Sequence, residues 1–233
     1  MSEPLAAAQV VSPGFRLPRP HALILDMDGL LLDTERLYLE VNVEAAAALG
    51  YALPTDTNMA MVGVAIDGCR RLLIDRLGTG FPFDRFRDLG YEIHDARMAS
   101  GVPLRAGAKA LVDWAQQEGL AMAVATSTQR ARAEDHLERA GLREMLDVLV
   151  TRDDVVNAKP APDPYLLAAE RLGVAPAAAL ALEDSANGVR SAAAAGVPVV
   201  MVPDIIDPDE PVRALAHAVL PSLDAVLAAL RGN

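Results

Sequence analysis

Residues 21–35 have the sequence HALILDMDGLLLDTE, and this stretch decides the fold. A short apolar run leads into Asp26, and Asp28 and Gly29 follow before apolar residues resume. The pattern predicts a buried strand of a parallel sheet that ends at Asp26, with Gly29 allowing a sharp turn. In open α/β sheets, ligands bind just beyond the carboxyl ends of the strands. Asp26 and Asp28 are therefore predicted to lie at a ligand site.

The spacing of Asp26 and Asp28 also points to a cation. Two carboxylates this close along the chain repel each other unless a positive charge lies between them. A bound metal ion is the simplest source of that charge, and oxygen-only ligation favours Mg²⁺.

Length and composition are those of a soluble globular protein. The 233 residues suffice for one large domain or two small ones, and 52% of them are hydrophobic. The net charge of −11 argues against nucleic acid and membranes as partners, because both select basic surfaces. The single cysteine, Cys69, allows no internal disulfide. No apolar run is long enough to span a membrane and residues 1–20 lack signal-peptide features, so we expect a cytoplasmic protein.

Strand and helix patterns alternate along most of the chain. Apolar runs predict further strands at about 120–125, 147–150, 179–182 and 197–202, and the helical patterns between them end at glycines. This alternation is typical of right-handed βαβ units. The predicted fold class is therefore α/β, with a doubly wound, Rossmann-like parallel sheet.

The stretch after the first strand breaks this alternation. Helical patterns lie at 55–61, 67–77 and 84–99, with no strand pattern between about 51 and 100. The block is too long for an ordinary crossover and predicts an inserted all-helical subdomain. The expected organisation is a flexible tail over 1–20, a core domain over 21–34 and 101–233, and a helical cap over 35–100.

Polar residues collect where the predicted strands end. Beyond Asp26 and Asp28, the residues in such positions are Thr126, Ser127, Thr128, Lys159, Glu183 and Asp184. Because parallel strands end at one edge of a sheet, these groups should converge. Each alone has an ordinary structural explanation, such as a turn, a helix N-cap or a solvated loop lysine. Together they predict a metal site beside a phosphate site.

Four motifs in this chain resemble those of one known family. They are DMDGLLLDTE, the TST that begins at Thr126, the KPAPDPY that begins at Lys159, and the EDSANGVRSAAAAG that begins at Glu183. Their order resembles that of the haloacid dehalogenase (HAD) superfamily. The resemblance extends from Ala22 to about Val202 and is greatest to the helical-cap subgroup with β-phosphoglucomutase and sugar-phosphate phosphatases. It implies an enzyme that forms an aspartyl-phosphate.

The resemblance, combined with side-chain chemistry, implies a role for each strand-end residue. Asp26 would be the nucleophile and Asp28 the general acid and base. Mg²⁺ would bind Asp26, the Asp28 carbonyl and Asp184, with Glu183 as a ligand directly or through water. The phosphoryl oxygens would be held by Thr126, Lys159 and the N–H groups of Gly29 and Ser127.

The expected activity is Mg²⁺-dependent hydrolysis of a small phosphate monoester, such as a sugar phosphate, by a monomer or weak homodimer. A phosphosugar mutase is an alternative. The positions aligned with cationic residues of the mutase look like Val62 and Ile66, which are apolar, although Arg70 and Arg71 could substitute. A phospho-accepting signalling domain has similar strand-end residues but needs neither the helical insertion nor Asp28. The segment 203–217 has turn-forming residues and an acidic run, with no function assigned.

Overall fold

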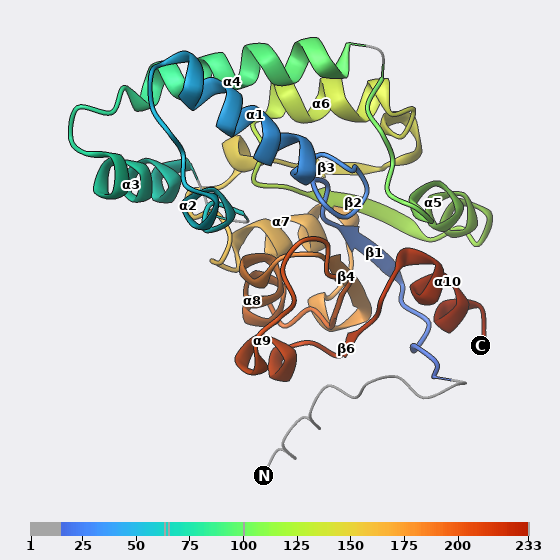
Figure 1. Cartoon of the computed structure of the whole chain (residues 1–233). Helices are drawn as coiled ribbons and strands as arrows, with labels where there is room; N and C mark the ends of the chain where they lie inside the picture. The colour runs from blue at the N-terminus through green and yellow to red at the C-terminus, as the bar shows by residue number, and fades with distance from the viewer. Residues whose placement is uncertain (1–14, 63, 65, 100, 233) are drawn as a thin grey trace. The chain divides into compact units, whose positions relative to one another are not determined.

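The computed structural model describes residues 15–62, 64, 66–99 and 101–232. Contacts within the chain divide it into two compact units (Figure 1). The core unit contains the described residues up to Leu32 and from Leu104 onward, and the cap unit contains those from Asp33 to Pro103. The predicted cap, 35–100, falls inside the bounds of the cap unit.

The core unit is built on a parallel sheet. Among its described residues, six strands lie in the order β3-β2-β1-β4-β5-β6, and every neighbouring pair is parallel. The strands are β1 (Ala22–Leu25), β2 (Ala121–Ala125), β3 (Val148–Val150), β4 (Ala179–Glu183), β5 (Val199–Met201) and β6 (Ala218–Val219). The strand order extends outward from β1 in both directions. The predicted doubly wound α/β sheet is therefore confirmed.

The first strand lies at the centre of the sheet and sets the register of its neighbours. Leu25 of β1 is paired with Val124 of β2 and with Leu182 of β4. All four residues of β1 are buried, as expected of a strand covered on both faces. This register brings the carboxyl ends of β1, β2 and β4 to one edge of the sheet.

Helices cover both faces of the sheet, with α7 and α8 on one face and α5 and α10 on the other (Figure 1). The helices of the core unit are α5 (Ala108–Gln117), α6 (Arg130–Arg139), η1 (Arg143–Met145), η2 (Arg152–Asp154), α7 (Asp163–Leu172), η3 (Pro176–Ala178), α8 (Ala186–Ala194), α9 (Glu210–Leu215) and α10 (Leu223–Arg231). Alanines of α7 and α8 share a buried cluster with Ile24 of β1. Their small side chains let these helices pack closely on the sheet.

The segment 203–217 contains structure that the sequence did not reveal. Helix α9 begins after Asp209, whose side chain accepts a hydrogen bond from the Val212 N–H at 3.0 Å. Asp204 forms an ion pair with Arg105. Strand β6 follows at once and adds to the edge of the sheet. The segment thus contributes helix α9 and leads into the edge strand of the core sheet.

The described end of the predicted tail is packed against the core unit. Leu17 is fully buried, and its N–H donates to the Ala229 carbonyl of α10 at 3.1 Å. The prediction of a flexible segment is therefore wrong around Leu17. Residues 1–14 lie outside the described residues.

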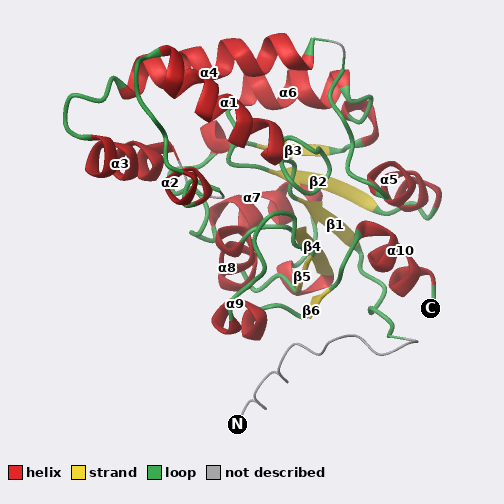
Figure 2. Ribbon diagram, in the orientation of Figure 1, coloured by secondary structure: helices red, strands yellow, loops and turns green. Residues whose placement is uncertain are grey.

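The cap unit contains helices and, among its described residues, no strand (Figure 2). Its helices are α1 (Glu35–Ala48), α2 (Thr55–Met59), α3 (Ile66–Leu77) and α4 (Phe83–Met98). Its own apolar cluster includes Leu73, Phe81, Phe83 and Phe86. The predicted all-helical insertion is confirmed for these residues. None of the described helices in either unit has the length and apolar character needed to span a membrane.

Candidate active site

The turn after β1 carries Asp26 and Asp28. The Asp26 N–H donates to the Leu182 carbonyl of β4 at 3.0 Å, and the residue is only 8% exposed. Gly29 adopts a φ of 84°, in the left-handed region that favours glycine. The Gly29 N–H donates to the Leu32 carbonyl at 2.9 Å within this turn. This N–H thus has an acceptor within the turn, and its predicted contact with a phosphoryl oxygen stays a prediction.

Lys159 lies between two carboxylates at the same edge of the sheet. Its Nζ is 2.5 Å from Asp26 Oδ1 and 2.5 Å from Glu183 Oε1. Asp26 follows β1, Glu183 ends β4, and Lys159 belongs to the loop before α7. Three separate segments thus meet at one buried ammonium group, where charge-assisted hydrogen bonds are strong.

Burial and neighbouring charges set the pKa values of this pair. Burial raises the pKa of Asp26 to about 8; the Lys159 ammonium opposes the rise, and the charges of Glu183 and Asp28 add to it. Burial acts to lower the pKa of Lys159, but its two carboxylate partners outweigh this effect and the pKa is raised. A further cation beside Asp26 would favour its charged form and lower this pKa.

Glu183 is fully buried, and both of its oxygens accept hydrogen bonds from the protein. Oε1 accepts from Lys159 and from the Tyr165 hydroxyl, the latter at 2.7 Å. Oε2 accepts from the Ser185 N–H at 3.2 Å and from its hydroxyl at 3.1 Å. Gly188 leaves room for this carboxylate, because a Cβ there would lie 1.8 Å from Glu183 Cδ. Glu183 is therefore held in one orientation that faces Lys159.

Three carboxylates approach closely enough to share a cation. One ligand oxygen from each of Asp26, Glu183 and Asp184 lies within 4.8 Å of the others. Such an all-oxygen set suits Mg²⁺ or Ca²⁺. Glu183 contributes to this set although its two oxygens already accept four hydrogen bonds from the protein.

Hydroxyl groups follow β2 at this edge. Thr126 is 3% exposed, and its Oγ1 accepts from the Thr128 N–H at 3.0 Å, while a hydroxyl can also donate. Ser127 is exposed. Thr128 Oγ1 donates to Asp28 Oδ2 at 2.7 Å and so holds the second aspartate of the turn. The loops after β1 and β2 are thus joined through side chains.

The structure brings Asp26, Lys159, Glu183 and Asp184 into one cluster, and it joins Asp28 to the segment that contains Thr126 and Ser127. The contacts of Thr128, Tyr165, Ser185 and Gly188 with Asp28 or Glu183 were not predicted from the sequence. Their only sequence signal is membership in the TST, KPAPDPY and EDSANGVRSAAAAG motifs. Motif membership does not say which side chain contacts Glu183 or Asp28.

Two cap residues, Cys69 and Arg70, have partners inside the cap unit. Arg70 donates to both oxygens of Asp84, at 3.2 and 2.5 Å, and its guanidinium lies over the Phe83 ring. Cys69 Sγ donates to the Val64 carbonyl at 3.3 Å. Burial raises the pKa of this thiol to about 11, so it is not a ready nucleophile.

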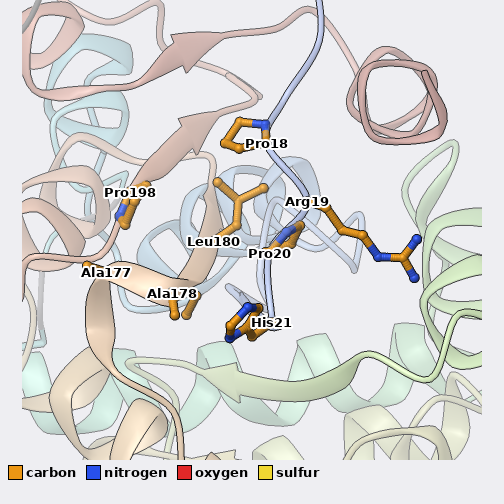
Figure 3. A pocket seen from close by; sticks show the side chains of 9 residues that line it. Pro18, Arg19, Pro20, His21, Ala177, Ala178, Leu180 and Pro198 are labelled. Atoms are coloured by element: carbon orange, nitrogen blue, oxygen red, sulfur yellow. The ribbon is translucent and has the colours of Figure 1, made fainter. Parts of the chain in front are cut away.

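A pocket at the opposite ends of the strands has different chemistry (Figure 3). Its lining comes from the segment before β1, the end of η3, the start of β4 and the residue before β5. It consists of Pro18, Arg19, Pro20, His21, Ala177, Ala178, Ala179, Leu180 and Pro198. The Arg19 side chain extends away from the other labelled side chains and pairs with Glu118 at 2.8 Å. This lining contains no carboxylate, so the candidate active site remains the acidic cluster.

The doubly wound sheet, its helical insertion and its strand-end acid–lysine cluster define an α/β enzyme. Residues 23–202 match the family model described as haloacid dehalogenase-like hydrolase, and the chain belongs to this family. The HAD resemblance of the four motifs is thereby confirmed. The chain is a hydrolase of this family, so the alternative of a signalling domain is set aside.

Relatives cover most of the chain. The phosphorylated carbohydrates phosphatase of Thermotoga maritima is 32% identical over 176 residues, which cover 76% of this chain and 82% of that protein. The crystal structure of CbbY from Rhodobacter sphaeroides in complex with phosphate is 31% identical, with a TM-score of 0.77, and covers 91% of this chain and 99% of that chain. A mutant of that CbbY in complex with xylulose-(1,5)bisphosphate is 31% identical, with a TM-score of 0.76 and coverage of 91% and 98%.

Proposed function

We propose that this protein is a Mg²⁺-dependent phosphatase that hydrolyses small phosphorylated carbohydrates through an aspartyl-phosphate on Asp26. One observation carries the proposal: the buried Asp26 carboxylate contacts Lys159 at a strand end, with Asp28 two residues further on. The names of the relatives support it. One is a phosphorylated carbohydrates phosphatase, and CbbY structures hold phosphate or a sugar bisphosphate.

The reaction has two halves. In the first, an Asp26 oxygen attacks phosphorus, the bond from phosphorus to the ester oxygen breaks, and Asp28 gives a proton to the leaving alcohol. In the second, the Asp28 carboxylate takes a proton from water, whose oxygen attacks phosphorus and frees Asp26. The hydrogen bond from Thr128 holds Asp28 during both halves. Lys159 and Thr126, with the Ser127 N–H, hold the phosphoryl oxygens.

Asp26, Asp184 and the Asp28 carbonyl are the groups that would hold Mg²⁺. When bound, the ion supplies positive charge beside the phosphoryl oxygens and offsets the repulsion among the carboxylates. The close approach of the Asp26 and Asp184 oxygens supports this assignment. The role of Glu183 is instead to hold Lys159, whose Nζ donates to Glu183 Oε1.

A phosphosugar mutase is the second candidate, because a CbbY mutant binds a sugar with two phosphates. A mutase must also hold the second phosphate. Arg70, a possible group for this, is already neutralised by Asp84. Ile66 offers an apolar side chain that is 45% exposed. These residues of the cap unit favour hydrolysis over isomerisation.

The test is a phosphate-release screen of the purified protein with Mg²⁺ against sugar phosphates, phosphoglycolate and nucleotides, run beside a β-glucose-1-phosphate isomerisation assay. Release of phosphate from sugar phosphates is expected, with loss of turnover in Asp26→Asn because an amide is a poor nucleophile. Isomerisation faster than release would overturn the phosphatase. Turnover at the wild-type rate in Asp26→Asn would overturn the nucleophile.

The proposal includes the setting in which the enzyme works. The net charge of −11 supports a small-molecule substrate and no nucleic acid or membrane partner. We expect a cytoplasmic monomer or weak homodimer, which sedimentation at several concentrations measures.

A further inference from the structure

Tyr165 contacts two residues of the candidate site without belonging to any step of the proposed reaction. It is fully buried near the start of α7, within the apolar cluster that includes Ile24. Its hydroxyl donates to Glu183 Oε1 at 2.7 Å. The Lys159 Nζ lies 5.2 Å from the centre of its ring. One side chain thus touches both members of the Lys159–Glu183 pair.

These contacts leave Glu183 little freedom. Oε1 is shared by Lys159 and Tyr165, and Oε2 is held by Ser185. On another side, Gly188 admits the carboxylate only because it lacks a Cβ. The orientation of the carboxylate in turn places the ammonium group, which must reach Asp26 from the other direction. The Tyr165 ring lies beside this ammonium group, with its centre 5.2 Å from Nζ.

We infer that Tyr165 is a positioning residue, which acts through Glu183 to aim the Lys159 ammonium at Asp26 and the phosphoryl oxygens. Its effect on turnover rests on the proposed function, whereas its effect on the position of Lys159 does not. The hydroxyl and the ring have separate roles. The hydroxyl fixes the orientation of Glu183, and the ring restricts the position of the Lys159 ammonium by contact and by cation–π attraction.

Removal of the hydroxyl alone separates positioning from packing. In Tyr165→Phe the ring stays, while Glu183 Oε1 keeps only Lys159 as a partner. The carboxylate can then rotate about its remaining contacts with Ser185 and draw the ammonium away from Asp26. Misalignment of a charged donor at the reacting group should lower kcat about tenfold and change KM less, because the lost alignment matters most in the transition state.

The kinetic experiment is a double-mutant cycle in the phosphate-release assay with Mg²⁺. Tyr165→Phe is combined with Glu183→Gln, and Tyr51→Phe is the matched control, because the Tyr51 hydroxyl also donates to a protein oxygen, the Gly80 carbonyl, at 3.2 Å. The expected results are a tenfold lower kcat in Tyr165→Phe, about no further loss when it is added to Glu183→Gln, and wild-type kcat in Tyr51→Phe. If Tyr165→Phe lowers kcat by the same factor in the wild type and in Glu183→Gln, Tyr165 acts independently of Glu183 and the inference is overturned. Wild-type kcat in Tyr165→Phe would overturn it as well.

A crystal structure of Tyr165→Phe tests the same inference without activity. The expected result is a Lys159 Nζ displaced from Asp26 Oδ1 beyond hydrogen-bond distance. An ammonium that stays within about 3 Å of both Asp26 and Glu183 would overturn it. If the wild-type protein releases phosphate from no substrate, the proposed function fails, and this structure still decides the role of Tyr165.

Discussion

The orientation of Glu183 depends on a missing side chain at Gly188. A Cβ at this position would lie 1.8 Å from Glu183 Cδ, where the carboxylate is fully buried and cannot move into solvent. Gly188→Ala should therefore displace Glu183, lower kcat and reduce the free energy of unfolding by about 1–3 kcal/mol, measured by urea denaturation. Gly80→Ala is the control, because a Cβ there meets nothing within 4 Å. Equal stability losses in both variants would contradict this account.

A second prediction concerns the hydrogen bond from Thr128 to Asp28, at 2.7 Å. Thr128→Val keeps the shape of the side chain and removes the hydroxyl, so Asp28 should be less well placed to protonate the leaving group. We expect kcat to fall about tenfold for a sugar phosphate. The fall should be smaller for p-nitrophenyl phosphate, whose leaving group needs less protonation. Equal losses with both substrates would show that Thr128 does not act through the acid step.

At the residue scale, sequence predicted the charged members of the site better than their supports. Asp26, Lys159 and Asp184 were identifiable because each follows a predicted strand of a parallel sheet. The contact between Tyr165 and Glu183 was not, because it joins residues 18 positions apart in two elements whose packing no local pattern describes. The hydrogen bond from the Gly29 N–H to the Leu32 carbonyl was not predictable either, because the hydrogen bonding of a turn depends on its actual backbone angles.

At the scale of elements, the loop that leads from β3 toward Lys159 is fixed by one carboxylate. Asp154, at the end of η2, accepts from the Thr151 N–H and hydroxyl at 2.8 and 2.6 Å, and from Arg130 and Arg171 at 2.6 and 3.2 Å. Burial acts to raise the pKa of Asp154, but the hydrogen bonds from Thr151 and the two arginines outweigh it and lower the pKa to about 2. The loop should therefore be sensitive to acid.

The third prediction follows from the sign of this shift. The pKa of Asp154 is lower in the folded chain than its ordinary value of 3.8, so its contribution to stability is complete above about pH 4 and is lost as the pH falls toward 2. At pH 7, the free energy of unfolding of Asp154→Asn should be on the order of 1 kcal/mol below that of the wild type. This difference in the free energy of unfolding should disappear near pH 2. Urea titrations at several pH values measure it, and a gap independent of pH would contradict the assignment.

Element length decided which parts of the fold could be predicted. Helix α5, Ala108–Gln117, is easy to predict, because its ten residues show an apolar face over several turns. Helix α9 has six residues and strand β6 has two, so neither is long enough to show a repeating pattern of apolar residues. Tertiary contacts and the Asp209 cap define them instead.

At the scale of the whole molecule, we predict that the acidic cluster makes stability depend on a bound cation. The protein carries a net charge of −11, and the oxygens of Asp26, Glu183 and Asp184 lie within 4.8 Å of one another with Lys159 as a buried partner. An ion that binds only the folded state stabilises it by mass action. Millimolar Mg²⁺ should therefore raise the Tm of the wild type above its value with EDTA, at ionic strength matched with KCl because any salt screens a net charge.

Asp184→Asn separates specific binding from this general screening. The substitution removes one donor from the cluster, so the Mg²⁺-dependent rise in Tm should be lost, while the Tm with EDTA should stay the same or increase as repulsion is relieved. Asp113→Asn changes the net charge by the same amount on the exposed side of α5, where Asp113 pairs with Lys109 at 2.6 Å, and should keep the full response. If all three proteins gain the same Tm from Mg²⁺, the ion acts on the total charge and not at the strand-end carboxylates. The calorimetric scan thus tests the metal site even before any substrate is identified.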